Sequence, residues 1–163
     1  MSQITRRHLF GLCAAGIGAA LGGRWTPAAA QAGRRFPVSL TEAQWRARLS
    51  ADAFLVLRRA GTERPGSSPL NNEHRRGVFH CAGCNQGLYA SATKFESHTG
   101  WPSFYQPLPH AIGTNVDRSL GEARTEVHCA RCGGHLGHVF NDGPRPTGLR
   151  YCMNGVAMRF QPG

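Results

Sequence analysis

The chain has 163 residues, of which 17% are charged, and a formal net charge of +10 at pH 7. This length fits one domain with an appended segment. The sequence has no dense basic run with interleaved aromatic residues of the kind that lines a nucleic-acid groove. We therefore expect a solvated basic surface and no nucleic-acid partner, with acidic or membrane-associated partners still open.

Residues 1–32 have the pattern of a cleaved twin-arginine export signal. The motif TRRHLF at Thr5–Phe10 leads into an uncharged, Gly/Ala-rich run that ends at Gly22, and small-residue cleavage sites follow at 28–32. The apolar run of about 14 residues is short for a spanning helix, which needs about 20. We expect passage through the twin-arginine export machinery to the periplasm, with a membrane anchor facing the periplasm as the alternative.

The next segment, residues 33–61, is predicted to contain two short helices. Thr41 and Gln44 form a T-x-x-Q capping box, and Leu40 and Trp45 occupy the positions of a hydrophobic staple. A second helical segment runs over 50–60, with two arginines in its last turn and a glycine stop at Gly61. Both helices are expected to cover a core.

From residue 77 onward the sequence favours an antiparallel β domain. Short apolar or alternating runs are separated by glycine and proline, with little helical pattern between them. The predicted strands lie at 77–80, 87–89, 125–128, 135–140 and 149–160.

Two CxxC pairs are the strongest metal signal. Cys81 and Cys84 form one knuckle, and Cys129 and Cys132 form the other. Four thiolates close a tetrahedron around one Zn²⁺, and such a closed site is structural. Two disulfides, redox-active CxxC pairs, or an iron centre of rubredoxin type are the alternatives. No organic cofactor is expected.

Cys152 is then the only thiol within residues 33–163 that the metal does not use. Residues alternate faces along a strand, so Arg150, Cys152 and Asn154 are predicted to share one surface, where the arginine favours the reactive thiolate. His135 and His138 are candidate acid, base or oxyanion partners. Being three residues apart, they both reach Cys152 only if the backbone bends near Gly137.

Taken together, these segments closely resemble the B-type peptide methionine sulfoxide reductases. The resemblance covers about residues 61–160 and rests on several motifs in order: Cys81-x-x-Cys84, SHTGWPSF at 97–104, RTEV at 124–127, Cys129-x-x-Cys132, GHLGHVF at 134–140, DGP at 142–144 and GLRYCMN at 148–154.

The resemblance implies a fold of two antiparallel β-sheets over residues 33–163, and reduction of the R epimer of methionine sulfoxide in proteins or peptides. By motif, Cys152 is the nucleophile that becomes a sulfenic acid, and Trp101 packs against the substrate methyl group. His135 and His138 hold and help protonate the sulfoxide oxygen. The remaining three residues orient water and side chains around the thiolate: Asp142, Arg150 and Asn154. The four knuckle cysteines match the zinc-binding members.

One position departs from part of that family. Members with a resolving cysteine carry it just before the Gly-Trp pair, where this chain has Thr99. We therefore expect direct reduction of the sulfenic acid by a thioredoxin-like protein or a small thiol, acting on a monomer. A zinc-ribbon binding module and a general thiol-disulfide carrier are the other classes considered. The first would not depend on Cys152, and the second would need a redox-active CxxC pair.

Overall fold

The computed structural model describes residues 36–163, so the predicted export signal at 1–32 lies outside the described part of the chain. Within residues 36–163, no helix is both long and apolar enough to cross a membrane.

The two predicted helices are present. Helix α1 (Glu42–Arg48) begins after Thr41, whose hydroxyl accepts a hydrogen bond from the Gln44 N–H, while the Gln44 side chain accepts one from the Thr41 N–H at 2.8 Å. The capping box is therefore confirmed. Helix α2 (Ala51–Arg59) is capped by the Ser50 side chain, which accepts from the Ala53 N–H.

The end of α2 differs from the expected glycine stop. Ala60, with φ 52°, takes the left-handed conformation, and the Gly61 N–H donates to the Leu55 carbonyl at 3.0 Å. A Cβ at Gly61 would lie 2.8 Å from Leu55 Cγ. The glycine is therefore needed for close packing on the last turn, rather than for its backbone conformation.

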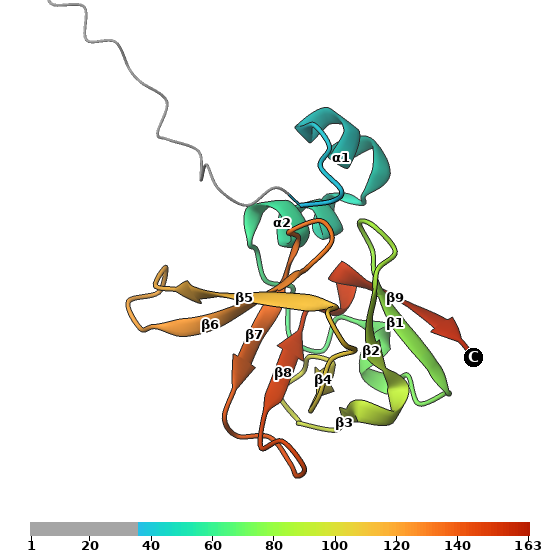
Figure 1. The fold of residues 1–163 in the computed structure, drawn as a ribbon, viewed down its shortest axis with the longest axis vertical. Helices are drawn as coiled ribbons and strands as arrows, with labels where there is room; N and C mark the ends of the chain where they lie inside the picture. The colour runs from blue at the N-terminus through green and yellow to red at the C-terminus, as the bar shows by residue number, and fades with distance from the viewer. Residues whose placement is uncertain (1–35) are drawn as a thin grey trace, which may run out of the picture. The chain divides into compact units, whose positions relative to one another are not determined.

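Two antiparallel sheets make up the rest of the described chain, as predicted (Figure 1). One sheet has three strands in the order β2-β1-β9, and the other has six in the order β3-β4-β8-β7-β6-β5. The strands are β1 (Gly77–Cys81), β2 (Gly87–Ala90), β3 (Lys94–Phe95), β4 (Ser103–Phe104), β5 (Ile112–Asp117), β6 (Arg124–Cys129), β7 (His135–Phe140), β8 (Arg150–Met153) and β9 (Met158–Pro162). There are also three 3₁₀ turns: η1 (Pro69–Asn72) lies between α2 and β1, η2 (Ser91–Thr93) lies between β2 and β3, and η3 (Gly155–Ala157) lies between β8 and β9.

The predicted strand at 149–160 is two strands in different sheets. η3 separates β8, in the six-stranded sheet, from β9, in the three-stranded sheet. The break between the two strands follows Asn154. A Cβ at Gly155 would overlap the Ser68 hydroxyl, so only glycine fits where the chain turns. Strands β3, β4 and β5 were not predicted.

The core joins the two sheets through aromatic side chains. Tyr89 on β2 stacks on Phe104 of β4 with ring centroids 4.3 Å apart, and its hydroxyl donates to the Met153 sulfur at 3.2 Å. Phe79 on β1 meets Phe104 edge-on at 4.9 Å. All four side chains are fully buried. Because Met153 is the neighbour of Cys152, this core fixes the strand that carries the candidate nucleophile.

Candidate active site and metal centre

The four knuckle cysteines form one buried cluster. Their sulfur atoms all lie within 4.8 Å of one another, and all five cysteines in the described part are unbridged. Cys81 Sγ and Cys132 Sγ are 3.7 Å apart, and Cys84 Sγ and Cys129 Sγ are 3.5 Å apart. Sulfur atoms bound at about 2.3 Å around a tetrahedral ion lie roughly 3.8 Å from one another, so the cluster fits one tetrahedral metal ion.

The two knuckles have the same backbone design. In each, the N–H of the residue after the second cysteine donates to the carbonyl of the first at 2.9 Å: Asn85 to Cys81 and Gly133 to Cys129. Asn85 and Gly133 both have left-handed φ values, 62° and 66°. Since β1 and β6 belong to different sheets, an ion held here would tie the two sheets together.

Three arginines bind the outside of the knuckles. Arg48 donates to the Gly83 carbonyl at 3.3 Å, Arg58 donates to the Cys132 carbonyl at 3.0 Å, and Arg131 donates to the Cys84 carbonyl at 3.3 Å. Two of these arginines come from α1 and α2. The helices are therefore anchored to the cluster as well as to the core, which extends their predicted covering role.

Cys152 lies in the middle of the six-stranded sheet, on a row of polar side chains. It pairs with Ser103 of β4 on one side and with His138 of β7 on the other, and His138 pairs in turn with Glu126 of β6. Directly opposite residues in antiparallel strands share a face, with Cβ atoms about 5 Å apart. One face of the sheet thus brings the thiol beside an imidazole and a hydroxyl.

A chain of hydroxyl groups adjoins the thiol. Ser97 Oγ lies 2.8 Å from Thr99 Oγ1 and 2.7 Å from Ser103 Oγ, and Thr99 Oγ1 lies 3.8 Å from Cys152 Sγ. Thr99 occupies the position at which some members of the family that the sequence resembles carry a resolving cysteine. The structure therefore places that position in contact with the Cys152 sulfur.

Arg150 meets the thiol and is itself held by Asp142. Arg150 Nε and Nη2 donate to the two carboxylate oxygens of Asp142 at 2.9 and 2.7 Å, and the guanidinium lies over the Phe140 ring. Burial raises the pKa of Cys152 above the ordinary thiol value, while the Thr99 hydroxyl, Arg150 and Ser103 act in the opposite direction. The expected lowering by Arg150 is present, but burial outweighs it.

The two histidines are brought together by a bulge. Along β6, Val127 pairs with Gly137 and the next residue, His128, pairs with His135, so β7 has one extra residue at this point. The His135 and His138 rings consequently lie 5.4 Å apart, edge to face. A Cβ at Gly137 would overlap the Cys152 carbonyl oxygen. The predicted backbone bend near Gly137 is confirmed, and the glycine also lets β8 approach.

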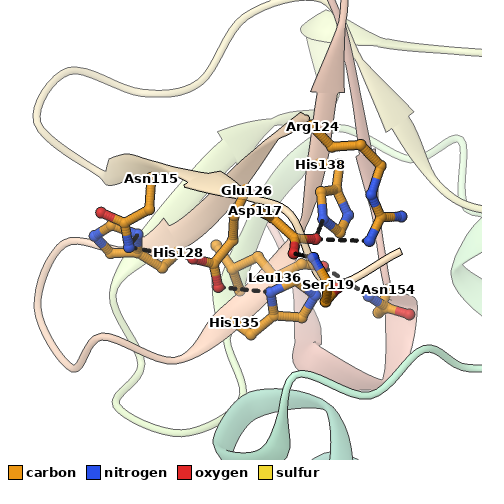
Figure 2. A network of polar contacts seen from close by, with 10 residues as sticks. All are labelled: Asn115, Asp117, Ser119, Arg124, Glu126, His128, His135, Leu136, His138 and Asn154. Atoms are coloured by element: carbon orange, nitrogen blue, oxygen red, sulfur yellow. Dashed lines mark hydrogen bonds and ion pairs between the residues drawn. The ribbon is translucent and has the colours of Figure 1, made fainter. Parts of the chain in front are cut away.

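Each histidine has a carboxylate partner that was not predicted (Figure 2). His135 Nδ1 is 2.8 Å from Glu126 Oε1, and His138 Nε2 is 2.8 Å from Asp117 Oδ2. Burial lowers the pKa of His138, and the hydrogen bond to Asp117 opposes that effect. The bond from His135 lowers the pKa of Glu126, so this carboxylate is ionised at neutral pH.

Trp101 and Asn154 are connected through Glu63, another residue that was not predicted. The Trp101 indole N–H donates to the Glu63 carbonyl at 3.2 Å, and Asn154 Oδ1 accepts from the Glu63 N–H at 2.9 Å. Asn154 Nδ2 donates to the Leu136 carbonyl at 3.0 Å, and the side chain is buried. Both ends of the Asn154 side-chain amide are therefore hydrogen-bonded to backbone groups, one in β7 and one in the loop that contains Glu63.

A cleft of about 610 Å³ lies beside this region and is separate from the thiol. Its walls come from α2, the 62–70 segment and η3, and they include Glu63 but none of Cys152, His135, His138 and Trp101. We place the candidate chemistry at Cys152, because Thr99 contacts its sulfur, His138 is its cross-strand partner and Arg150 acts on its pKa, while none of these residues lines the cleft.

Some of these residues carried a sequence signal and others did not. Glu126 belongs to the RTEV motif, and alternation along β6 was enough to put it on the same face as Arg124. Asp117 sits in the polar run GTNVDRS, where no apolar alternation marked β5. Glu63 lies in a turn-rich segment, and its contacts become visible only when 63 and 154 are brought together by the fold.

A thiol set among imidazoles, hydroxyls and a guanidinium, apart from a four-cysteine cluster, defines a thiol-based oxidoreductase. The chain belongs to the SelR domain family, whose model matches residues 49–162. It is 48% identical over 126 residues to "Peptide methionine sulfoxide reductase MsrB" of Agrobacterium fabrum, covering 77% of this chain and 93% of that protein. It is 52% identical to the protein of the same name from Bradyrhizobium diazoefficiens, covering 75% and 88%.

Proposed function

We propose that this protein reduces the R epimer of methionine sulfoxide, in proteins or peptides, to methionine. The observation that carries the proposal is the single thiol outside the four-cysteine cluster of the described chain, placed on one sheet face with two imidazoles. The family membership supports the reaction class, since the relatives are named for methionine sulfoxide reduction.

In the proposed reaction the Cys152 thiolate attacks the sulfoxide sulfur. The sulfoxide oxygen ends on Cys152 as a sulfenic acid, the sulfoxide sulfur is reduced by two electrons to the thioether, and the cysteine sulfur is oxidised by two electrons. The proton that leaves the thiol ends on the sulfenic oxygen, so the step consumes no net proton. His135 and His138 carry this proton, and they bind the oxygen while it moves from the substrate sulfur to the cysteine sulfur.

The other predicted site residues act on the thiol and on the substrate. Arg150 stabilises the thiolate, and Asp142 holds the guanidinium in place through its two hydrogen bonds. Trp101 supplies an apolar surface for the substrate methyl group, with its indole N–H fixed by Glu63. Asn154 orients the groups around the thiolate through β7, since its amide is bound to the Leu136 carbonyl.

We further propose that Cys81, Cys84, Cys129 and Cys132 hold one structural Zn²⁺. The close spacing of the four sulfurs and the burial of all four cysteines support a closed site. Such an ion would fix the two knuckles and hence the two sheets, and no chemical step passes through it.

The sulfenic acid is proposed to be reduced directly by an external thiol, either a thioredoxin-like protein or a small thiol. Thr99 supports this proposal, because the position that contacts Cys152 Sγ has a hydroxyl in place of a second thiol. The remaining cysteines of the described chain are buried in the metal cluster.

The N-terminal motif supports export by the twin-arginine route and repair of oxidised periplasmic proteins. Fractionation of cells that express the full chain tests this part, with a variant in which Arg6 and Arg7 are both replaced by lysine as the control. The proposal requires the protein in the periplasm and the variant in the cytoplasm; the same location for both would refute it.

Mass spectrometry tests the chemical step. We expect that one equivalent of a peptide-bound R sulfoxide, added without reductant to the zinc-loaded protein, increases the mass of the Cys152 peptide by one oxygen atom, in a form that dimedone traps. If methionine formed while Cys152 remained a thiol, or if a knuckle cysteine became oxidised instead, the sulfenic acid route would be wrong.

A further inference from the structure

Glu126 and Asp117 are the carboxylates hydrogen-bonded to His135 and His138, and the proposed reaction gives them no role. Each accepts a hydrogen bond from one of the candidate catalytic histidines, on a different ring nitrogen (Figure 2). We propose that they are positioning residues that lock His135 and His138 in opposite tautomers, so that the two rings present different nitrogens to the substrate oxygen. This inference rests on the proposed function and extends it.

The His138 pair is held from three sides. Asp117 Oδ2 accepts from His138 Nε2 at 2.8 Å and from Arg124 Nη2 at 2.6 Å, while Asp117 Oδ1 accepts from the Ser119 N–H at 2.8 Å. These hydrogen bonds, with that from Ser119 the largest contribution, keep the pKa of Asp117 well below its ordinary value. The carboxylate is therefore an acceptor at both oxygens, and His138 must carry its proton on Nε2.

The His135–Glu126 pair fixes the tautomer in the same way, but through the Nδ1 nitrogen of the ring. Glu126 Oε1 accepts from His135 Nδ1 at 2.8 Å, and Glu126 Oε2 accepts from Asn115 Nδ2 at 3.1 Å. Asn115 is the cross-strand partner of Glu126 on β5, so the carboxylate is fixed by its own sheet neighbour. His135 must therefore carry its proton on Nδ1.

The remaining nitrogens are Nε2 of His135 and Nδ1 of His138. Within residues 36–163 neither makes a hydrogen bond, and the two rings are in edge-to-face contact 5.4 Å apart. Both nitrogens are acceptors while the rings are neutral, and each becomes a donor when its ring takes up a proton. Each ring thus has one nitrogen available to take up a proton and return it during the proposed reaction.

The carboxylates do not themselves take the proton. An ionised carboxylate behind an imidazole fixes the tautomer and orientation of the ring and stabilises the imidazolium while it exists. Asp117 accepts further hydrogen bonds from the Ser119 N–H and from Arg124, whereas Glu126 has Asn115 as its one further hydrogen-bond donor within residues 36–163. The His138 ring is therefore predicted to be held more rigidly than the His135 ring.

The first test is spectroscopic and needs no turnover. Ring ¹⁵N shifts of the zinc-loaded protein, with His135 and His138 assigned through His135→Gln and His138→Gln variants, report the tautomer of each neutral ring. We expect the Nδ1–H form for His135 and the Nε2–H form for His138. The same tautomer on both rings, or the reversed assignment, would overturn the proposal.

The second test is kinetic and uses Asp117→Asn. An asparagine puts its NH₂ group either against the Ser119 N–H or against the His138 and Arg124 donors, so one of these contacts is lost in each orientation. We expect kcat to fall by about 10²-fold, the lower end of the range for acid–base groups, with KM unchanged.

Glu73→Gln is the matched control. Glu73 also accepts at both carboxylate oxygens, from Arg75, and within residues 36–163 it makes no hydrogen bond to a histidine. We expect wild-type kcat for it. If Asp117→Asn keeps the wild-type kcat or loses activity only through KM, the positioning role is wrong. If the wild-type protein fails to reduce sulfoxide while the two tautomers are as expected, the proposed function fails and the positioning survives.

Discussion

Replacing Arg150 by methionine should make the Cys152 thiol markedly less reactive at neutral pH. Burial already raises the pKa of this thiol, and the Arg150 guanidinium is the one positive charge that acts against it. Methionine keeps an apolar stem over Phe140, where the arginine now packs with its guanidinium carbon 4.5 Å from the ring centroid. The substitution therefore removes the charge with little change in packing.

The size of the effect follows from the positive charge that is removed. An arginine beside an acidic group typically lowers its pKa by about 1–3 units. Since one pKa unit is a tenfold change in the ionisation equilibrium, the thiolate fraction should fall at least about 10-fold at pH values where the thiol is mostly protonated. The sign is fixed: without the guanidinium the pKa of Cys152 rises further, so the reactive form appears only at higher pH.

The assay is the pH dependence of alkylation by iodoacetamide. A Cys13→Ser background with zinc bound leaves Cys152 as the single cysteine outside the cluster. The rate should rise with pH through the pKa of Cys152 in both proteins, with the Arg150→Met curve displaced to higher pH and the two converging once both thiols are ionised. Arg159→Met, an exposed arginine on β9, should leave the curve unchanged. Coincident curves for Arg150→Met and wild type would refute the reasoning.

Three further predictions address the metal, the bulge and the resolving position. Cys84→Ser should unfold the domain, because structural zinc contributes about 10–16 kcal/mol, as much as a whole domain's stability of about 5–15 kcal/mol; a variant that binds no metal but keeps its circular dichroism spectrum would contradict this. Gly137→Ala should cost at least about 2 kcal/mol in urea unfolding, since its Cβ overlaps the Cys152 carbonyl; an unchanged midpoint would show that β7 and β8 separate freely. Thr99→Cys should form a disulfide with Cys152 after one turnover, given that the Thr99 hydroxyl lies 3.8 Å from Sγ; a dimedone adduct on Cys152 as the lasting product would count against it.

The parts of the fold with local signals could be predicted from the sequence. The capping box of α1 needs only Thr41 and Gln44, and the two knuckles need only their CxxC spacing, so both were found and both are present. The bend at Gly137 was predicted because two histidines three residues apart cannot share a face on a regular strand. These are arguments within one segment, and the structure agrees with them.

The parts that depend on distant contacts could not. Nothing within 149–160 shows that the chain changes sheets at Gly155, because the reason is the Ser68 hydroxyl on another segment. Strand β5 has too little apolar alternation to be seen, and so its Asp117 was missed although it binds His138. The pKa of Cys152 also depends on burial, which outweighs the neighbouring arginine that the strand pattern revealed.

The most direct test is the turnover of the two separated epimers of a peptide-bound methionine sulfoxide. The zinc-loaded protein is assayed with dithiothreitol as reductant, beside a Cys152→Ser variant with the same metal content and the same circular dichroism spectrum. We predict that only the R epimer is reduced and that the variant is inactive. Reduction of the S epimer, or R-epimer turnover that survives in Cys152→Ser, would contradict the account.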